Sequence, residues 1–145
     1  MNDIAEAILA KNIYCTLSTV TDDGAAWGTP VHFAYDNENI YWLSHPDAVH
    51  SLNIEHDGRV FITVFDSRQL AETLGDRGAV YISSKAVKLS GDAAVAARDI
   101  YADRFPDDND RKMSEWDVYA APIGTLNEDR TKGQLVYFTN GGDRA

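Results

Sequence analysis

The chain contains a series of short stretches in which apolar and polar residues alternate, or in which β-branched and aromatic residues are concentrated. A two-residue period and a β-branched composition are typical of strands, whereas helices repeat every three to four residues. Turn signals rich in Asp, Asn and Gly separate several of these stretches. The expected strands are residues 14–20, 25–35, 40–43, 59–66, 79–89, 116–121 and 134–139.

Three other segments show apolar residues at helical spacing or a helix-start signal. Polar segments that contain glycine, or a run of acidic residues, are typical of loops. The expected helices are residues 3–11, 46–56 and 93–105, and the longest expected loops are residues 67–78 and 106–110.

These elements predict a mainly β fold with flanking helices. The strands follow one another through short turns, which favours an antiparallel barrel or sandwich with helices packed outside it. Helices do not alternate with strands, so a doubly wound sheet is excluded. A length of 145 residues suits a single domain over residues 1–145, and no repeat or linker divides it.

Composition excludes several classes of partner. The formal net charge is −10, with 13 basic and 23 acidic residues, which argues against nucleic acid and anionic membrane surfaces. No apolar run is long enough to span a membrane. The single cysteine, Cys15, lies in an expected strand and is interpreted as a core residue; its isolation suits a reducing cytoplasm.

The strand at residues 25–35 has an irregular centre. Pro30 cannot donate a ladder hydrogen bond, so it indicates an edge, a bulge or a place where the sheet opens. Gly28, two residues earlier, is compatible with a close approach to this backbone. Two interpretations remain open from the residues alone: an irregular edge strand, or a strand that opens for a ligand.

The junction between the strand at residues 40–43 and the next helix is a candidate anion site. Pro46 suits the first helical position, and Ser44 and His45 lie in the capping region. A helix start offers unpaired N–H groups and the positive end of a dipole. Pro46 itself lacks a donor, however, and Asp47 places a negative charge in the same turn.

The sequence gives little support for a metal site, a hydrolytic centre or a glycine-rich nucleotide-binding loop. The histidine spacings do not bring imidazoles onto one helical face, and there is no HExxH-type pattern, so no metal site is expected. No Gly-x-Ser-x-Gly elbow or glycine-rich phosphate loop occurs, and no residue stands out as a catalytic acid or base. Trp27, Trp42 and Trp116 are candidates for stacking on a planar ring, although strand tryptophans are more often core or interface residues.

The order and spacing of many short motifs resemble the pyridoxamine 5′-phosphate oxidase-like family of FMN-binding split barrels. The resemblance is strongest over residues 5–105, and no single motif is diagnostic. The matching pieces are Leu17-Ser18-Thr19, Gly24, Thr29-Pro30-Val31, Phe33-Ala34-Tyr35-Asp36, Ile40-Tyr41-Trp42-Leu43-Ser44, Asn53, Asp57, Arg59-Val60, the strand from Val80 to Ala86 and the helix at residues 93–105.

The resemblance implies a six-stranded antiparallel split barrel that forms a homodimer, with FMN held in a cleft between subunits. The strand from Thr29 to His32 would then lie along the isoalloxazine ring, and Ser44 with the following helix would face the ribityl phosphate. The cofactor-binding residues implied in this way are Thr29, Pro30, Val31, His32, Leu43, Ser44, His45, His50 and Asn53.

One departure from the family pattern affects the cofactor. Members that hold FMN well carry a basic pair at the positions of Ala48-Val49-His50, where this chain keeps only His50. We expect an FMN-dependent oxidoreductase acting on an unknown small molecule or electron donor. The alternatives are a non-catalytic module for flavin, deazaflavin or haem, and a split barrel that has lost its cofactor.

Overall fold

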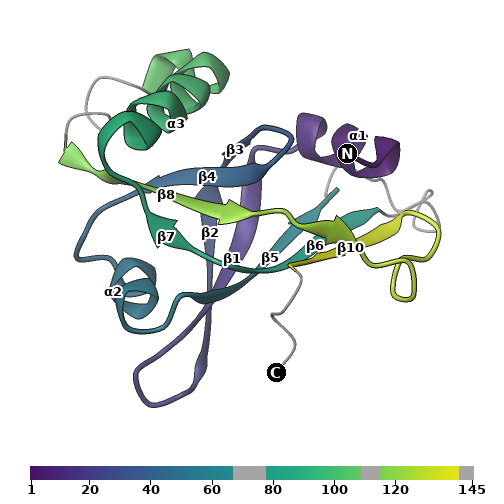
Figure 1. The fold of residues 1–145 in the computed structure, drawn as a ribbon, viewed down its shortest axis with the longest axis horizontal. Coiled ribbons are helices and arrows are strands. Elements are labelled where there is room, and N and C mark those ends of the chain that lie inside the picture. The colour runs from purple at the N-terminus through teal and green to yellow at the C-terminus, as the bar shows by residue number, and fades with distance from the viewer. Residues whose placement is uncertain (67–77, 109–114, 141–145) are drawn as a thin grey trace.

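The alternating stretches form ten strands in two sheets within the residues that the structure describes (Figure 1). This structure, a computed structural model, describes residues 1–66, 78–108 and 115–140. The six-stranded sheet has the order β2 (Ala26–His32), β1 (Tyr14–Val20), β5 (Arg59–Phe65), β6 (Ala79–Lys85), β10 (Leu135–Thr139) and β9 (Thr125–Leu126). The four-stranded sheet has the order β3 (Ala34–Tyr35), β4 (Asn39–Ser44), β8 (Asp117–Pro122) and β7 (Val87–Lys88).

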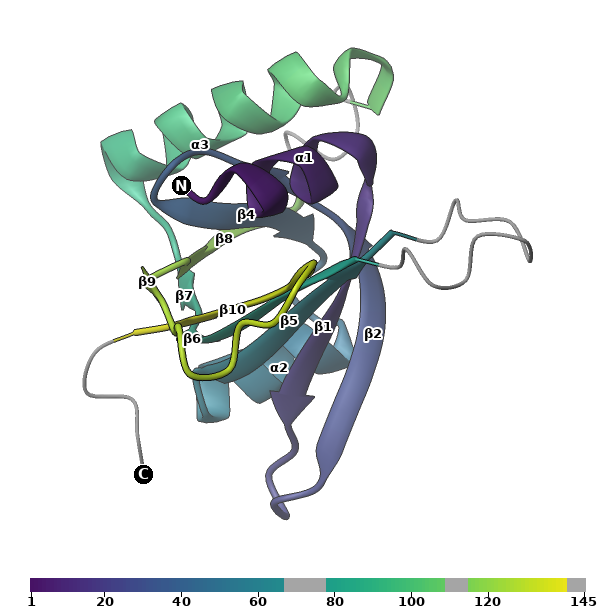
Figure 2. The ribbon, with the colours of Figure 1, turned by 90° about the vertical axis from the view of Figure 1, so that its right-hand side faces the viewer.

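The helices flank these sheets, as the sequence predicts (Figure 2). The expected loop at residues 67–78 falls almost wholly outside the described residues, as does the end of the expected loop at residues 106–110. No helix in the described part of the chain is long and apolar enough to cross a membrane. The helices are α1 (Asp3–Lys11), α2 (Val49–His56), α3 (Gly91–Arg104) and the short 3₁₀ helix η2 (Pro106–Asp108).

The mainly β class is confirmed, but the expected six-stranded antiparallel barrel is not. The strands form two separate sheets, and β10 pairs with β6 in parallel, with Val136 opposite Val80. The other pairings, including β1 with β2 and β5 with β6, are antiparallel. The six-stranded antiparallel barrel was implied by the family resemblance, and the short turns between consecutive strands favoured antiparallel pairing. The return of β10 to the side of β6 is a long-range pairing that turn signals do not report.

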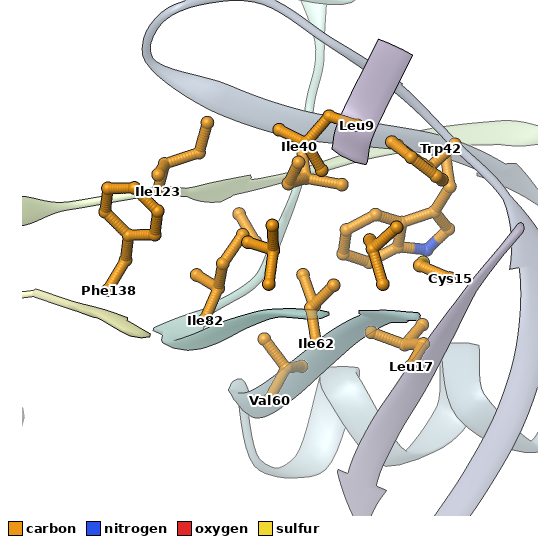
Figure 3. Packing of buried hydrophobic residues seen from close by; sticks show 14 of the residues in the cluster. Leu9, Cys15, Leu17, Ile40, Trp42, Val60, Ile62, Ile82, Ile123 and Phe138 are labelled. Atoms are coloured by element: carbon orange, nitrogen blue, oxygen red, sulfur yellow. The ribbon is translucent and has the colours of Figure 1, made fainter. Parts of the chain in front are cut away.

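The main core lies between the two sheets (Figure 3). Leu17 and Ile62 point into it from the six-stranded sheet, and Ile40 and Trp42 meet them from β4. All four side chains are buried. Cys15 belongs to the same cluster, and burial raises the pKa of its thiol to about 12, which confirms a core residue rather than a nucleophile.

A second core lies on the other face of the four-stranded sheet, beneath α3. Tyr41 and Leu43 alternate with Ile40 and Trp42 along β4 and therefore point to this opposite face. There they pack with Tyr101 of α3, as part of a cluster that also contains residues of β8. The β4 strand is thus buried on both faces, which holds its carboxyl end, Leu43 and Ser44, in a fixed position.

Two of the expected strands are divided, because the chain passes from one sheet to the other. The segment at residues 25–35 breaks at Phe33, whose N–H donates to the Ile13 carbonyl at 3.0 Å. The segment at residues 79–89 breaks at Ala86, whose N–H donates to the Gly58 carbonyl at 2.8 Å. Of the three positions that the sequence left open for Pro30, the structure shows the edge, since β2 is the outermost strand of its sheet.

The start predicted for the helix at residues 46–56 is wrong. The helix α2 begins at Val49, with Ala48 as an N-cap that makes no side-chain capping hydrogen bond. Pro46 and the residue after it form a tight turn, closed by the Ala48 N–H donating to the His45 carbonyl at 3.1 Å. Pro is as well suited to the second position of such a turn as to the first position of a helix, so the sequence signal is ambiguous.

Candidate functional site

A pocket of about 290 Å³ opens between the end of the edge strand β2 and the carboxyl end of β4. We call it the β2–β4 pocket. Both helices α2 and α3 and the segment before β8 contribute side chains to it. Its lining residues are Tyr14, Pro30, Val31, His32, Leu43, Ser44, His45, Ala48, His50, Tyr101 and Trp116.

The polar end of the pocket is built on one contact between two elements. The hydroxyl of Ser44, at the end of β4, hydrogen-bonds to Nε2 of His50 in the first turn of α2. Ser44 is buried and His50 is half-buried. Burial lowers the pKa of the His50 imidazole, because a charged ring would lose hydration there. His50 is therefore neutral at neutral pH.

His45 is oriented by the turn that precedes α2. Its Nδ1 accepts a hydrogen bond from the Asp47 N–H at 3.0 Å, and its carbonyl accepts from the Ser51 hydroxyl at 2.8 Å. A neutral imidazole that accepts at one nitrogen carries its proton on the other. In this arrangement His45 thus offers an Nε2–H donor at the pocket.

Aromatic rings form the remaining walls. The His32 ring lies between Tyr14 and Phe105, with centroid distances of 4.3 Å and 5.4 Å. Trp116 meets the His45 ring edge-on, at 6.3 Å and an interplanar angle of 84°. These rings contact one another and give the pocket an aromatic lining, which can pack against a planar ligand.

Seven of the nine residues expected at the cofactor line this one pocket. They come from β2, β4, the turn and α2, which are separated in sequence. The two that do not line it are Thr29 and Asn53. The amide of Asn53 donates to the Thr19 hydroxyl of β1 at 3.0 Å, so it fastens α2 to the sheet.

Gly28 is also outside the pocket. A Cβ there would meet only Thr16 and Ser18 side-chain atoms at 3.8 Å and 3.9 Å, which is ordinary contact. No close approach within this chain therefore requires a glycine at this position.

Four lining residues were not predicted as cofactor residues: Tyr14, Ala48, Tyr101 and Trp116. Trp116 had been singled out as a candidate for stacking, and its position confirms only that it lines a pocket. Trp42 lies in the core, stacked on Tyr119 at 5.9 Å, and Trp27 is 43% exposed. No sequence signal marks Tyr101, which reaches the pocket through the packing of α3.

The pocket is uncharged over its described lining, which includes no Lys, Arg, Asp or Glu. Arg98 of α3 comes near through its bond to the Trp116 carbonyl, at 2.6 Å, but does not line the pocket. Among the described residues, no cluster of His, Cys, Asp and Glu is arranged to hold a metal ion. The site offers flat apolar walls and neutral hydrogen-bonding groups.

A second groove of about 300 Å³ lies beside this pocket and shares Tyr14 and Pro30 with it. We call it the outer groove. Two exposed apolar residues line it, Ile13 at 48% and Phe65 at 50% exposure. The two hollows therefore form one continuous region around the edge strand β2.

Comparison with known proteins identifies the family. The sequence pattern described as pyridoxamine 5′-phosphate oxidase matches residues 1–138. The chain belongs to this family. No curated protein matches its sequence.

Solved structures of low sequence identity share the fold. HutZ, the haem storage protein from Vibrio cholerae, is 17% identical over 83% of this chain and 88% of its own, with a TM-score of 0.70. A haem-binding protein from Mycobacterium smegmatis is 22% identical over 86% of this chain and 52% of its own, with a TM-score of 0.66. An F420 reductase is 18% identical over 83% of this chain and 93% of its own, with a TM-score of 0.59.

FMN is the cofactor that the family resemblance implies, and the described lining can be compared with its two ends, the planar ring and the phosphate tail. The flat walls formed around His32 and Trp116 fit a planar ring. The hydroxyl and imidazoles of Ser44, His45 and His50 are hydrogen-bonding groups that fit polar atoms of a ligand tail. The described lining therefore fits a flavin ring, without a cation for the phosphate.

Proposed function

We propose that this protein is a flavin-dependent oxidoreductase, with FMN as the expected cofactor bound in the β2–β4 pocket. The observation that carries the proposal is the meeting, in one flat-walled pocket, of the edge strand Pro30–His32 with Ser44, His45 and His50. These residues come from separate elements, and they are the ones that the family resemblance assigns to the cofactor. When bound, the flavin supplies hydride or electron transfer at its ring.

The protein's own part is to position and shield that ring. Edge strands present a row of backbone groups without a strand partner, and β2 is such an edge. Pro30 adds a rigid apolar surface without an N–H. Tyr14 and Trp116 close the sides. The Nε2–H of His45 and the Ser44–His50 pair provide hydrogen bonds at the other end.

A homodimer with the flavin in a shared cleft is part of the proposal. Sites for drug-sized ligands and cofactors enclose roughly 300–1,000 Å³. The β2–β4 pocket, at about 290 Å³, falls just below that range. The outer groove continues from it with the exposed apolar residues Ile13 and Phe65. A second copy seated there would cover this surface and supply the missing wall.

Two of the structural neighbours are described as haem proteins, which makes haem the second candidate ligand. The geometry of His45 argues against this residue as a haem ligand. A histidine that binds a metal usually donates its other ring N–H to a protein acceptor. His45 does the reverse, since its Nδ1 accepts from the Asp47 N–H, so its Nε2 carries a proton and has no free lone pair. A deazaflavin such as F420 has a similar tricyclic ring and remains the closest alternative to a flavin.

The test is reconstitution of the purified protein with FMN, followed by fluorescence quenching of the flavin. We expect binding at micromolar concentration and bleaching of the visible flavin absorbance by a reduced nicotinamide under anaerobic conditions. Ala48→Trp fills the pocket and is expected to abolish binding. Ala96→Trp, on the exposed side of α3, is the matched control.

Each of the other possible results of this reconstitution would favour a different function. Bound flavin that no reduced nicotinamide bleaches favours a non-catalytic module. Binding of haem or a deazaflavin in place of FMN favours those carriers. No binding of any of the three indicates a barrel that has lost its cofactor. Binding that survives Ala48→Trp unchanged would contradict the β2–β4 pocket as the binding site.

A further inference from the structure

The described lining of the β2–β4 pocket carries hydrogen-bonding groups but no charged side chain, and this bears on which part of a flavin it can recognise. We infer that the site selects the ring and not the phosphate, so that it binds riboflavin and FMN with similar affinity. The inference rests on the proposed flavin function and concerns the specificity of the same pocket.

The first observation is the state of the polar groups. His50, the residue at the position of the family's basic pair, points its Nε2 at the Ser44 hydroxyl. The two groups therefore satisfy each other, and His50 is half-buried within the pocket. The Nδ1 of His45 is occupied by the Asp47 N–H. What remains for a ligand is a set of neutral donors and acceptors.

The second observation is that nearby charges on the described residues are already engaged. The guanidinium of Arg98 donates to the Trp116 carbonyl. Asp117 stands opposite Ser44 in the β4–β8 register, and Lys88 lies 3.9 Å from its carboxylate. The net charge of the chain, −10, also repels the phosphate dianion of FMN.

The size of the effect follows from the kind of hydrogen bond. A neutral hydrogen bond changes affinity by up to about tenfold, whereas two charge-assisted bonds to a phosphate change it by about a hundredfold or more. We therefore expect the dissociation constants of riboflavin and FMN to differ by less than about tenfold.

The experiment compares the two flavins on the full-length protein by fluorescence titration, at a pH above the ordinary histidine pKa of about 6.5. Wild type is measured beside His50→Lys and Ala48→Lys, each of which adds a cation to the pocket lining. His56→Lys is the matched control, because it adds the same charge to the exposed end of the same helix. Ala48→Lys keeps the test valid if His50→Lys does not fold.

The expected result is a wild-type ratio of FMN to riboflavin affinity below about tenfold, and an increase of about tenfold or more in that ratio for a pocket lysine. His56→Lys should leave the ratio unchanged. A wild-type preference for FMN of about a hundredfold or more would overturn the inference while leaving the flavin function intact. Equal gains from His56→Lys and the pocket lysines would also overturn it. Binding of neither flavin would overturn the proposed function and this inference together.

Discussion

His50 shows how local surroundings change what one side chain can do. In the sequence it is the one residue with basic character in the segment Ala48-Val49-His50. In the structure its ring is half-buried against the Ser44 hydroxyl, and burial lowers its pKa. The side chain that seemed to preserve part of a phosphate site is therefore a neutral hydrogen-bonding group.

This lowered pKa has a consequence for stability. The unfolded chain takes up a proton at His50 near pH 6.5, but the folded protein does so only at lower pH. The contribution of His50 to stability is therefore complete above about pH 6.5 and is lost as the pH falls toward the folded pKa. In His50→Gln this source of acid sensitivity is absent.

Urea unfolding of wild type and His50→Gln over a pH series measures the effect. We expect the free energy of unfolding of wild type to fall relative to that of the variant below about pH 6.5. The difference should stop growing once the folded protein is also protonated. Parallel curves for the two proteins would show that the imidazole is not held neutral.

At the scale of elements, the carboxyl end of α3 is fastened to the carboxyl end of α1. One nitrogen of the Arg104 guanidinium donates to the Leu9 carbonyl at 2.9 Å and also to the Asn12 carbonyl. The guanidinium also lies over the Phe33 ring, 4.7 Å from its centroid. A cation at the carboxyl end of a helix donates to carbonyls that have no helical partner. It also interacts favourably with the negative end of the helix dipole.

Removal of this contact should destabilise the whole fold. We expect Arg104→Ala to lower the free energy of unfolding by about 2–3 kcal/mol, because two carbonyls lose a charged donor in a half-buried site. Arg104→Lys should lose about 1–2 kcal/mol, since an ammonium keeps the charge but does not stack on the Phe33 ring as the planar guanidinium does. Arg130→Ala, whose guanidinium lies over the Tyr137 ring at 5.6 Å, is the control and should change stability by less than about 0.5 kcal/mol. Equal losses for the Arg104 and Arg130 variants would contradict the assignment.

At the scale of the molecule, two hollows lined by described residues adjoin beside the edge strand β2. The outer groove and the β2–β4 pocket meet at Tyr14 and Pro30, beside the exposed residues Ile13 and Phe65. Exposed apolar patches of this kind often mark interaction sites. The proposed second copy would cover this region.

A charge placed in this region should therefore weaken the dimer. We expect wild type to sediment as a dimer at micromolar concentration, and Phe65→Asp to raise the dissociation constant of the dimer by about tenfold or more. Val95→Asp is the matched control, because Val95 is 60% exposed on α3, away from the groove. A wild-type monomer at all concentrations, or equal effects of the two substitutions, would contradict the shared cleft.

The order of the family motifs along the chain predicted many of the residues that line the candidate site. Pro30, Ser44 and His50 were expected together and line one pocket. Asn53 was expected with them because it follows His50 by three residues, but its amide is bonded to Thr19 across the interface with β1. Tyr101 was missed because it reaches the pocket from a helix remote in sequence. Spacing within one helix does not report which neighbour a side chain meets.

The sequence by itself determined most of the strand segments, an irregular position in the hydrogen-bond ladder at Pro30 and the resemblance to the family, since alternation, a missing donor and motif order are local properties of the chain. Only the tertiary structure decided that β10 runs parallel to β6, that the chain changes sheets at Phe33 and Ala86, and that Pro46 belongs to a turn. It also decided that His50 is neutral. The parallel pairing and the changes of sheet depend on partners distant in sequence, and the state of His50 depends on burial. The turn at Pro46 is local, but its sequence signal also fitted a helix start.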